Sequence, residues 1–390
     1  MKTGLEVLLE SGSARIRGRH IGLLAHPASV NRDLETAACC LREAAGAKSV
    51  RLFAPEHGIG ASAQDMIAVE EAWDPITGFP VVSLYGDDEA SLTPKVSDLE
   101  GLDLLLCDLQ DVGSRYYTFS ATLIRCLAPA AEAGLPVLVL DRPNPLGGVA
   151  VEGNRVAPSF FSFVGEIPIP NRHGLTMGEI ARAAVSMRGI DVDLEVLPME
   201  GWNRAWYWDE TGLPWVLPSP NMPTPETALV YPGACLLEGT NLSEGRGTTR
   251  PFEIVGAPWI AARALADSLN ALGLEGVLFR PLTFEPAFHK HAGTLCGGVQ
   301  YHVHDRQAFS PLLAGLALLI EARKQDPDSF RWRRETYEFV SDRLAIDLLA
   351  GTDAWRRGIE NGATARDLAE EYARSEEEFL EERRSWLIYP

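Results

Sequence analysis

The sequence predicts an α/β protein with a Rossmann-like N-terminal domain built on a parallel sheet and a smaller α+β C-terminal domain. Short apolar runs alternate with amphipathic stretches over the first part of the chain, and polar loop sequence then dominates 202–258. Apolar runs of about four to eight residues are typical of strands covered on both faces, as in parallel sheets with crossover helices. We place the domain boundary near residue 228, which gives domains 1–228 and 229–390.

The N-terminal domain is expected to contain five strands with helices between some of them. The glycine motifs that cradle phosphates, GxGxxG after the first strand and GxxxxGK[ST], are absent from the sequence. The Rossmann-like interpretation is therefore architectural, and we expect no cofactor. The predicted strands are His20–His26, Val50–Ala54, Val81–Tyr85, Leu102–Asp108 and Pro136–Asp141, and the predicted helices lie near Leu34–Ala45 and Thr118–Ala133.

The C-terminal domain follows a segment rich in Pro, Gly, Thr and Asn, between about Trp202 and Pro258. Long polar loops of this kind usually line a site. The elements expected beyond it are helices near Trp259–Leu272, Phe309–Arg323, Arg334–Leu349 and Ala363–Glu382, with extended segments at Val277–Thr283 and Gly298–His304.

Composition excludes several classes of partner. The 35 basic and 54 acidic residues give a net charge of −19, which repels phosphate backbones, so no nucleic-acid partner is expected. No run approaches the roughly 18 apolar residues of a membrane helix, and Glu6 and Glu10 interrupt the early apolar run, so we expect no membrane partner, no signal peptide and a cytoplasmic location. The six cysteines lack zinc-site spacing and are expected to be reduced, mostly buried thiols. The oligomeric state does not follow from the sequence.

Polar residues follow three of the predicted strands directly. Glu56 and His57 come after the second strand, 108–111 ends the fourth, and 141–144 follows the fifth. Ligands of open parallel sheets bind beyond the carboxyl ends of the strands. We therefore expect one cleft to gather these clusters.

Seven longer strings stand out along the chain, in this order: LFAPEHG, DLQDVGSRYYTF, LDRPNPLGG, FVGEIPIPNRHGLTMGE, PSPNMPT, YPGACLLEGTNLSEGRGTTRPFEIVGAPW and GVQYHVHDR. With these strings in this order, the chain resembles the exo-β-N-acetylmuramidases, or NamZ-type glycoside hydrolases, over roughly residues 4–390. The resemblance implies hydrolysis of terminal, non-reducing N-acetylmuramic acid from peptidoglycan fragments, in a cleft between the two domains, with small peptidoglycan saccharides as the partners.

Glycosidic cleavage needs a proton donor and usually a second carboxyl group. The resemblance implies that Glu56, in the PEHG motif, is the catalytic acid. The candidates for the second group are Asp108, Asp111, Glu238 and Glu244, of which we rank Asp111 and Glu244 first. Each of these acids could equally serve to bind loop amides. Substrate assistance by the 2-acetamido group is a further alternative.

Substrate binding is expected to use loop residues inside the family strings. Arginine matches the lactyl carboxylate of muramic acid in bidentate geometry, while amides, hydroxyls and aromatic rings suit a sugar. The arginine candidates are Arg115, Arg142, Arg172, Arg246 and Arg250, and the other candidates are His57, Gln64, Tyr116, Tyr117, Asn144, His173, Asn221, Glu238, Thr240 and Asn241.

Two further patterns bear on the chemistry. The pairs His289/His291 and His302/His304 have H-x-H spacing, but no acid or cysteine cluster accompanies them, so we expect no metal site. The segment 59–66 lacks an Arg and an Asp that relatives carry after PEHG, although Gln64 is kept. That difference favours the alternatives of a non-catalytic amino-sugar-binding protein or a hydrolase of another N-acetylhexosaminide, whereas the retained Glu56 argues against the first.

Overall fold

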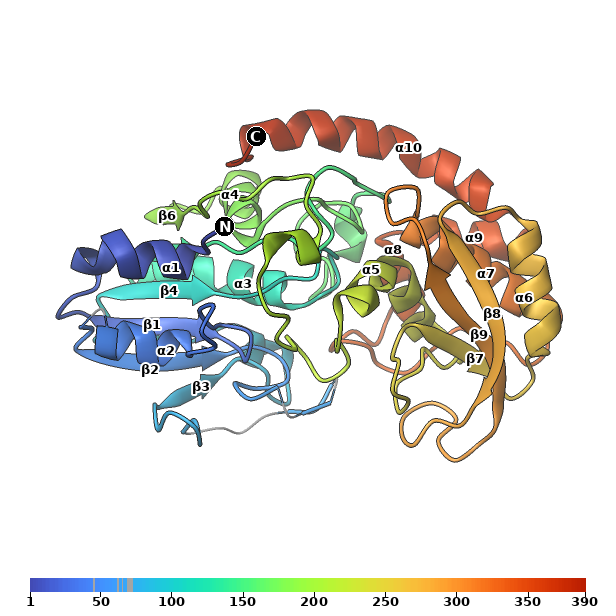
Figure 1. Cartoon of the computed structure of the whole chain (residues 1–390), viewed down its shortest axis with the longest axis horizontal. Coiled ribbons are helices and arrows are strands. Elements are labelled where there is room, and N and C mark those ends of the chain that lie inside the picture. Colours follow the sequence, from blue (N-terminus) through green and yellow to red (C-terminus); the bar gives the residue numbers. More distant parts are fainter. Residues whose placement is uncertain (45, 62, 65, 69–72) are drawn as a thin grey trace.

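The computed structural model describes residues 1–44, 46–61, 63–64, 66–68 and 73–390, and it contains two sheets (Figure 1). The larger sheet has six parallel strands in the order β3-β2-β1-β4-β5-β6, and the smaller one is antiparallel in the order β7-β9-β8. The larger order is that of doubly wound, Rossmann-like folds. The predicted fold class is therefore confirmed.

All five predicted strands of the large sheet are present, and a sixth was missed. The strands are β1 (His20–Ala25), β2 (Ser49–Ala54), β3 (Val81–Ser83), β4 (Leu104–Asp108), β5 (Val137–Leu140) and the missed β6 (Leu194–Leu197). Their helices are α1 (Gly4–Val7), α2 (Ala37–Cys39), α3 (Phe119–Glu132) and α4 (Met177–Arg188).

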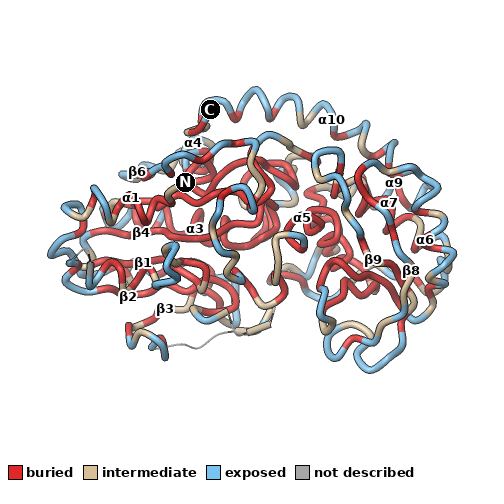
Figure 2. The backbone as a smooth tube through the Cα atoms, in the orientation of Figure 1, coloured by how far each residue is buried: buried red, intermediate tan, exposed pale blue. Residues whose placement is uncertain are grey.

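Helices cover both faces of this sheet, as the apolar strand runs predict. In β4, Leu104 and Leu106 belong to the core under α1 and α2, whereas Leu105 and Cys107 belong to the core under α3 and α4. Figure 2 shows the central strands β1 and β4 red over most of their length. Because both faces are covered, only the ends of the strands are open to a ligand.

The first predicted helix is too long at its start. Leu34 has a φ of 62°, a left-handed conformation that no helix continues, and α2 begins only at Ala37 after the Thr36 cap. Ala45, at the predicted end, lies outside the described residues.

The second domain surrounds the small sheet. It contains the strands β7 (Ile254–Ala257), β8 (Val277–Phe284) and β9 (Cys296–Val303), and the helices α5 (Pro225–Ala234), α6 (Ala262–Ala271), α7 (Pro311–Gln325), α8 (Ala345–Ala350), α9 (Ala354–Glu360) and α10 (Ala365–Glu382). The proposed boundary at 228 falls inside α5. Whether the division at that residue is the right one stays a prediction.

The predicted helix Arg334–Leu349 is wrong over most of its length. Only α8 is helical there, because Tyr337 and Val340 form a hairpin whose two tip residues, Glu338 and Phe339, have φ values of 45° and 66°. Two consecutive left-handed residues make the primed turn of a tight hairpin and exclude an α-helix.

Helices α5 and α7 of the second domain make a close crossing beside the first domain. A Cβ added to Gly233 of α5 would lie 1.8 Å from the Pro311 carbonyl oxygen, and one added to Gly315 of α7 would lie 2.3 Å from the Gly233 carbonyl oxygen. Only glycine allows the backbones to approach in this way. One hydrophobic cluster accordingly runs from α3 and α4 through α5 and α7 to α10.

Buried polar bonds add to this interface. Arg115 of the N-terminal domain donates from Nη2 to the Leu349 carbonyl oxygen of α8 at 2.7 Å, and Asn171 donates to the same oxygen at 3.0 Å. Glu152 accepts from Ser310 Oγ at 2.7 Å and from Leu312 N at 3.1 Å, at the start of α7. The relative position of the domains is therefore fixed by both packing and hydrogen bonds.

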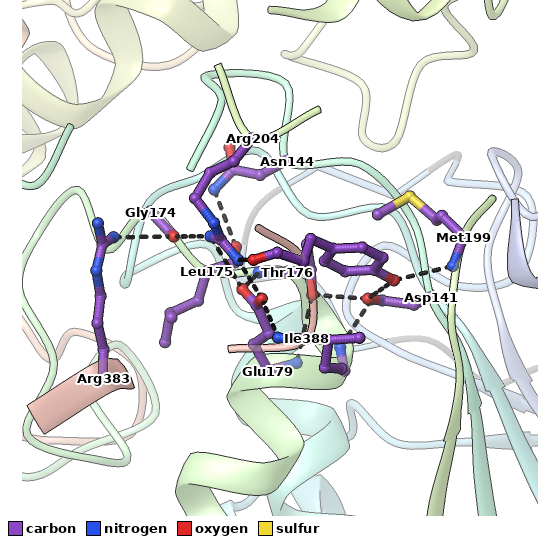
Figure 3. Close-up of polar contacts among 12 residues, drawn as sticks. Asp141, Asn144, Gly174, Leu175, Thr176, Glu179, Met199, Arg204, Arg383 and Ile388 are labelled. Atoms are coloured by element: carbon purple, nitrogen blue, oxygen red, sulfur yellow. Dashed lines mark hydrogen bonds and ion pairs between the residues drawn. The ribbon is translucent and has the colours of Figure 1, made fainter. Parts of the chain in front are cut away.

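The C-terminal end returns to the first domain. Helix α10 crosses over the molecule toward α4 (Figure 1), and the residues after it bind the edge of the large sheet (Figure 3). Tyr389 donates from its hydroxyl to Asp141 Oδ2 at 2.6 Å, the Ile388 amide donates to Glu179 Oε1 at 2.9 Å, and Arg383 donates to the Gly174 carbonyl oxygen at 3.1 Å.

All six cysteines are free thiols and five are buried, as predicted. Among the helices in the described ranges, none combines the length and the apolarity needed to cross a bilayer.

The buried Asp141 carboxyl makes stability depend on pH. Burial raises the pKa of Asp141 to about 6, even though hydrogen bonds from Tyr389 and Thr176 lower it. The folded chain thus keeps this proton to higher pH than the unfolded chain, whose aspartates have a pKa of about 3.9. The contribution of this group to the free energy of unfolding is present below about pH 4 and is lost as the pH rises to about 6.

Asp141→Asn removes this titration. Between pH 4 and 6, the slope of the free energy of unfolding against pH should become more positive by up to about 1.4 kcal/mol per pH unit, measured by urea denaturation. Asp191→Asn, at an exposed position of the same domain, should keep the wild-type slope. Parallel curves for Asp141→Asn and wild type would contradict the assignment.

Candidate active site

A pocket opens where the carboxyl ends of the large sheet face the second domain. The space between its lining atoms, including the opening to solvent, is about 470 Å³. The expected cleft between the domains is therefore present, but of the three strand-end clusters expected in it, only Glu56 and His57 line this pocket. Its lining residues are Glu56, His57, Tyr116, Tyr117, Thr118 and Val164 from the N-terminal domain, Ser219, Asn221, Met222 and Tyr231 around the start of α5, and Glu238, Arg246, Phe252, Tyr337 and Glu338 from the C-terminal domain.

Glu56 lies just beyond the end of β2 and is 4% exposed. Thr118 donates from Oγ1 to Glu56 Oε2 at 2.7 Å, and the Met66 amide donates to Oε1 at 3.3 Å. Thr118 stands at the N-cap of α3, yet its hydroxyl makes no cap bond. The hydroxyl that would ordinarily cap this helix thus fixes the carboxyl group in the pocket.

The turn after Glu56 is held by His57. His57 has a φ of 72°, and its Nδ1 lies 3.0 Å from the Ala63 carbonyl oxygen. A non-glycine residue in the left-handed region costs free energy and persists where its surroundings require it. The turn orients Glu56 and lets His57 line the pocket as well. Ser62 and Asp65 of the altered 59–66 segment lie outside the described residues.

Glu238 and Arg246 form the facing charged wall. Arg246 Nη1 lies 2.9 Å from Glu238 Oε1, and the guanidinium stands over the Phe252 ring at 4.9 Å. Tyr337 donates from its hydroxyl to Glu238 Oε2 at 2.7 Å. The predicted residues Glu238 and Arg246 are therefore in the same pocket as Glu56, with the Glu238 charge bound to a cation.

Glu244 is an anchor for this wall. Its fully buried carboxylate contacts Arg246 Nη1 at 3.0 Å, His289 Nδ1 at 3.1 Å and Lys290 Nζ at 2.9 Å. Burial raises its pKa, but Lys290, His289 and Arg246 outweigh burial and hold the pKa well below its usual range. Glu244 is thus an anion that cannot donate a proton near neutral pH, and it lies outside the set of lining residues. A catalytic role for it stays a prediction.

Asp111 and His173 lie together in a buried site of their own. Asp111 Oδ2 accepts from the Gly113 amide at 2.6 Å and lies 3.2 Å from His173 Nε2, while His173 Nδ1 accepts from the Leu175 amide at 3.1 Å. Neither side chain is among the described residues that line the pocket. Their predicted roles in catalysis and binding stay predictions.

The structure separates the candidate arginines. Arg142 forms a bidentate ion pair with Asp108, at 2.6 and 2.9 Å. Arg115 donates to carbonyl oxygens of three different segments, and burial lowers its pKa to about 10. Arg172 is paired with Glu152 at 2.7 Å. Of the five predicted arginines, Arg246 is the one that lines the pocket.

Gln64 and Asn221 are hydrogen-bonded to each other beside the pocket. Asn221 donates from Nδ2 to Gln64 Oε1 at 2.8 Å, and Asn221 itself lines the pocket. Tyr117 also lines it and packs edge-on against Tyr231, with ring centroids 5.9 Å apart. Of these predicted binding residues, Asn221 and Tyr117 line the pocket with Glu56, and Gln64 contacts Asn221.

Three other predicted binding residues donate hydrogen bonds to main-chain carbonyl oxygens. Only the bond of Thr240 is local, whereas those of Asn144 and Asn241 join segments distant in sequence. Asn144 donates to the Leu175 carbonyl oxygen at 3.0 Å, Thr240 to that of Leu237 at 2.8 Å, and Asn241 to that of Ser329 at 2.9 Å.

Sequence reasoning missed eight lining residues, Thr118, Val164, Ser219, Met222, Tyr231, Phe252, Tyr337 and Glu338. The first six lie within the family strings, which is the signal that points to them. Tyr337 and Glu338 fall in the segment predicted as a helix, so no pattern assigns them to the site. Within the described ranges, no group of three or more His, Cys, Asp or Glu side chains is arranged to hold a metal ion.

Comparisons with known proteins agree with this architecture. The model of the N-terminal part of exo-beta-N-acetylmuramidase NamZ matches residues 21–226, and the model of its C-terminal part matches residues 229–389. The peptidoglycan beta-N-acetylmuramidase NamZ of Bacillus subtilis (strain 168) is 43% identical over 389 residues, which cover 100% of this chain and 91% of that protein.

Two crystal structures of DUF1343 family proteins from Bacteroides fragilis have the same fold. Their TM-scores are 0.88 and 0.77, at 32% and 27% identity, and the matches cover 100% of this chain and 99% and 98% of theirs. With both family models and a full-length relative in agreement, the chain belongs to the NamZ family of exo-beta-N-acetylmuramidases and is a glycosidase.

Proposed function

We propose that this enzyme releases terminal, non-reducing N-acetylmuramic acid from peptidoglycan-derived fragments, with Glu56 as the general acid. The relative from Bacillus subtilis is named a peptidoglycan beta-N-acetylmuramidase, and the matching family models are named for an exo-beta-N-acetylmuramidase. The observation that carries the proposal is the position of Glu56, a nearly buried carboxyl group held by Thr118 in a pocket between the domains. A general acid must be held within hydrogen-bond reach of the leaving oxygen, and a carboxyl group fixed in the pocket supports that role.

The other lining residues support a sugar substrate. Tyr116 and Tyr117 contribute aromatic surface to the lining, and Asn221 contributes an amide. Sugar-binding pockets combine aromatic surface with a few oriented polar groups. Arg246 supplies positive charge for the lactyl carboxylate that distinguishes muramic acid from glucosamine.

Cell-wall recycling is the setting that we propose for this activity. A small pocket walled by two domains suits the end of a short saccharide better than a continuous polymer. Location in the cytoplasm stays a prediction. The direct test of the function is release of chromophore from a β-N-acetylmuramide compared with the matching β-N-acetylglucosaminide, with the muramide as the preferred substrate.

Glu56→Gln tests the acid role. Gln keeps the shape and the hydrogen bond from Thr118 but cannot deliver a proton, so kcat on the natural disaccharide should fall about 10²–10⁴-fold while KM changes little. The loss should be much smaller for a nitrophenyl glycoside, whose leaving group departs without protonation. Wild-type turnover of the disaccharide would make Glu56 structural, and equal losses on both substrates would reject the proton-donor role.

Arg246→Met tests recognition of the lactyl group. A hydrogen bond to a charged group contributes about 1.5–3 kcal/mol, so the ratio of kcat/KM for muramide over glucosaminide should fall by about 10- to 100-fold. The glucosaminide is the internal control, because damage to the Glu238 wall would lower both values. An unchanged ratio would show that Arg246 does not read the lactyl carboxylate.

A further inference from the structure

The tight turn at 337–340 is held by side-chain contacts from three of its residues, Tyr337, Glu338 and Phe339. Tyr337 and Val340 exchange both main-chain hydrogen bonds, at 3.0 and 2.9 Å, so the tip consists of Glu338 and Phe339 alone. Both tip residues are left-handed, in a turn type that strongly prefers Asn and Gly. Such strain persists only where the surroundings impose it, and it clusters at functional sites.

The surroundings impose it through all three side chains at once. The Tyr337 hydroxyl donates to Glu238. Phe339 packs on the Tyr85 ring, with centroids 5.6 Å apart. Glu338, only 5% exposed, accepts a hydrogen bond at 3.1 Å from the Tyr85 hydroxyl of the opposite domain. The turn therefore delivers one carboxyl group, that of Glu338, into the pocket from the second domain.

Glu338 is one of three carboxylic acids among the described lining residues, with Glu56 and Glu238. Glu56 belongs to the first domain and Glu238 is bound by Arg246 and Tyr337. The two other acids ranked for the second role, Asp111 and Glu244, lie outside the lining. Glu338 is thus placed to act on a substrate from the wall that faces Glu56.

We propose that Glu338 is the second catalytic carboxyl group and acts as the base for the attacking water. This inference rests on the proposed function. In the step, the water oxygen forms a bond to the anomeric carbon as the glycosidic C–O bond breaks and its electron pair moves to the leaving oxygen. Glu56 gives its proton to that oxygen, and the Glu338 carboxylate takes a proton from the water.

Glu338→Gln tests the assignment, because Gln still accepts the Tyr85 hydrogen bond but cannot take up a proton. The value of kcat should fall about 10²–10⁴-fold on both the disaccharide and the nitrophenyl muramide, since water must be activated whatever the leaving group. Glu56→Gln should differ by sparing the nitrophenyl substrate. The matched control is Glu335→Gln, an exposed residue of the same segment, which should keep wild-type kcat and KM.

Azide provides a readout that a structural role would not move. It is an anionic nucleophile that needs no base, so Glu338→Ala in azide should recover turnover of the nitrophenyl muramide. The product should be the glycosyl azide of inverted configuration, identified by NMR. Thermal melting of each variant shows whether the fold is kept, and the Gln variant alone decides the kinetic test if Ala unfolds.

The outcomes separate the two hypotheses. A wild-type enzyme that releases no N-acetylmuramic acid overturns the proposed function. An active wild type with Glu338→Gln within about threefold of it overturns only the role of Glu338. Loss of activity in Glu338→Gln without any glycosyl azide from Glu338→Ala also overturns the base role, because the carboxylate would then act elsewhere than on the nucleophile.

Discussion

The backbone contact between α5 and α7 is the constraint on which the pocket depends. At Gly233 and Gly315 the two helices touch without intervening side chains. The chain on either side of Gly233 supplies Tyr231 and Glu238 to the pocket. Any side chain at the crossing would push these residues away from Glu56, which the other domain supplies. Close packing at a point remote from the chemistry therefore determines whether the two halves of the site meet.

Charge is distributed around the pocket according to what surrounds each acid. Glu56 is held by a hydroxyl and an amide, both neutral donors. Glu244 is surrounded by cations that keep it ionised. Two buried glutamates thus differ in their surroundings, since neutral donors hold Glu56 whereas cations surround Glu244 and make it a fixed counter-ion. Arg246 contacts both Glu238 and Glu244, so the buried Glu244 carboxylate helps to hold the Arg246 side chain in the pocket wall.

Local sequence patterns predicted most of the fold and about half of the residues that line the pocket. The strands of the large sheet could be predicted because strands buried on both faces leave continuous apolar runs, and β6 was missed because its residues are largely exposed or half-buried. Glu56 follows directly from its place after a strand. Glu338 could not be found in this way, because its turn is imposed by Tyr85, which is 253 residues distant in sequence. Arg115 and Arg142 have the right chemistry to bind a substrate carboxylate. In the folded chain, however, Arg115 is bonded to main-chain oxygens and Arg142 is paired with Asp108.

The return of the C-terminal segment to the first domain gives the molecule a second connection between its halves. The chain passes from one domain to the other near α5 and comes back along α10, where Arg383 and Tyr389 fasten it to α4 and the large sheet. Two bodies joined at two separated points can rotate only about the line through those points. The packed interface and its buried hydrogen bonds remove that remaining rotation, so Glu56 and the opposite wall are held at one separation.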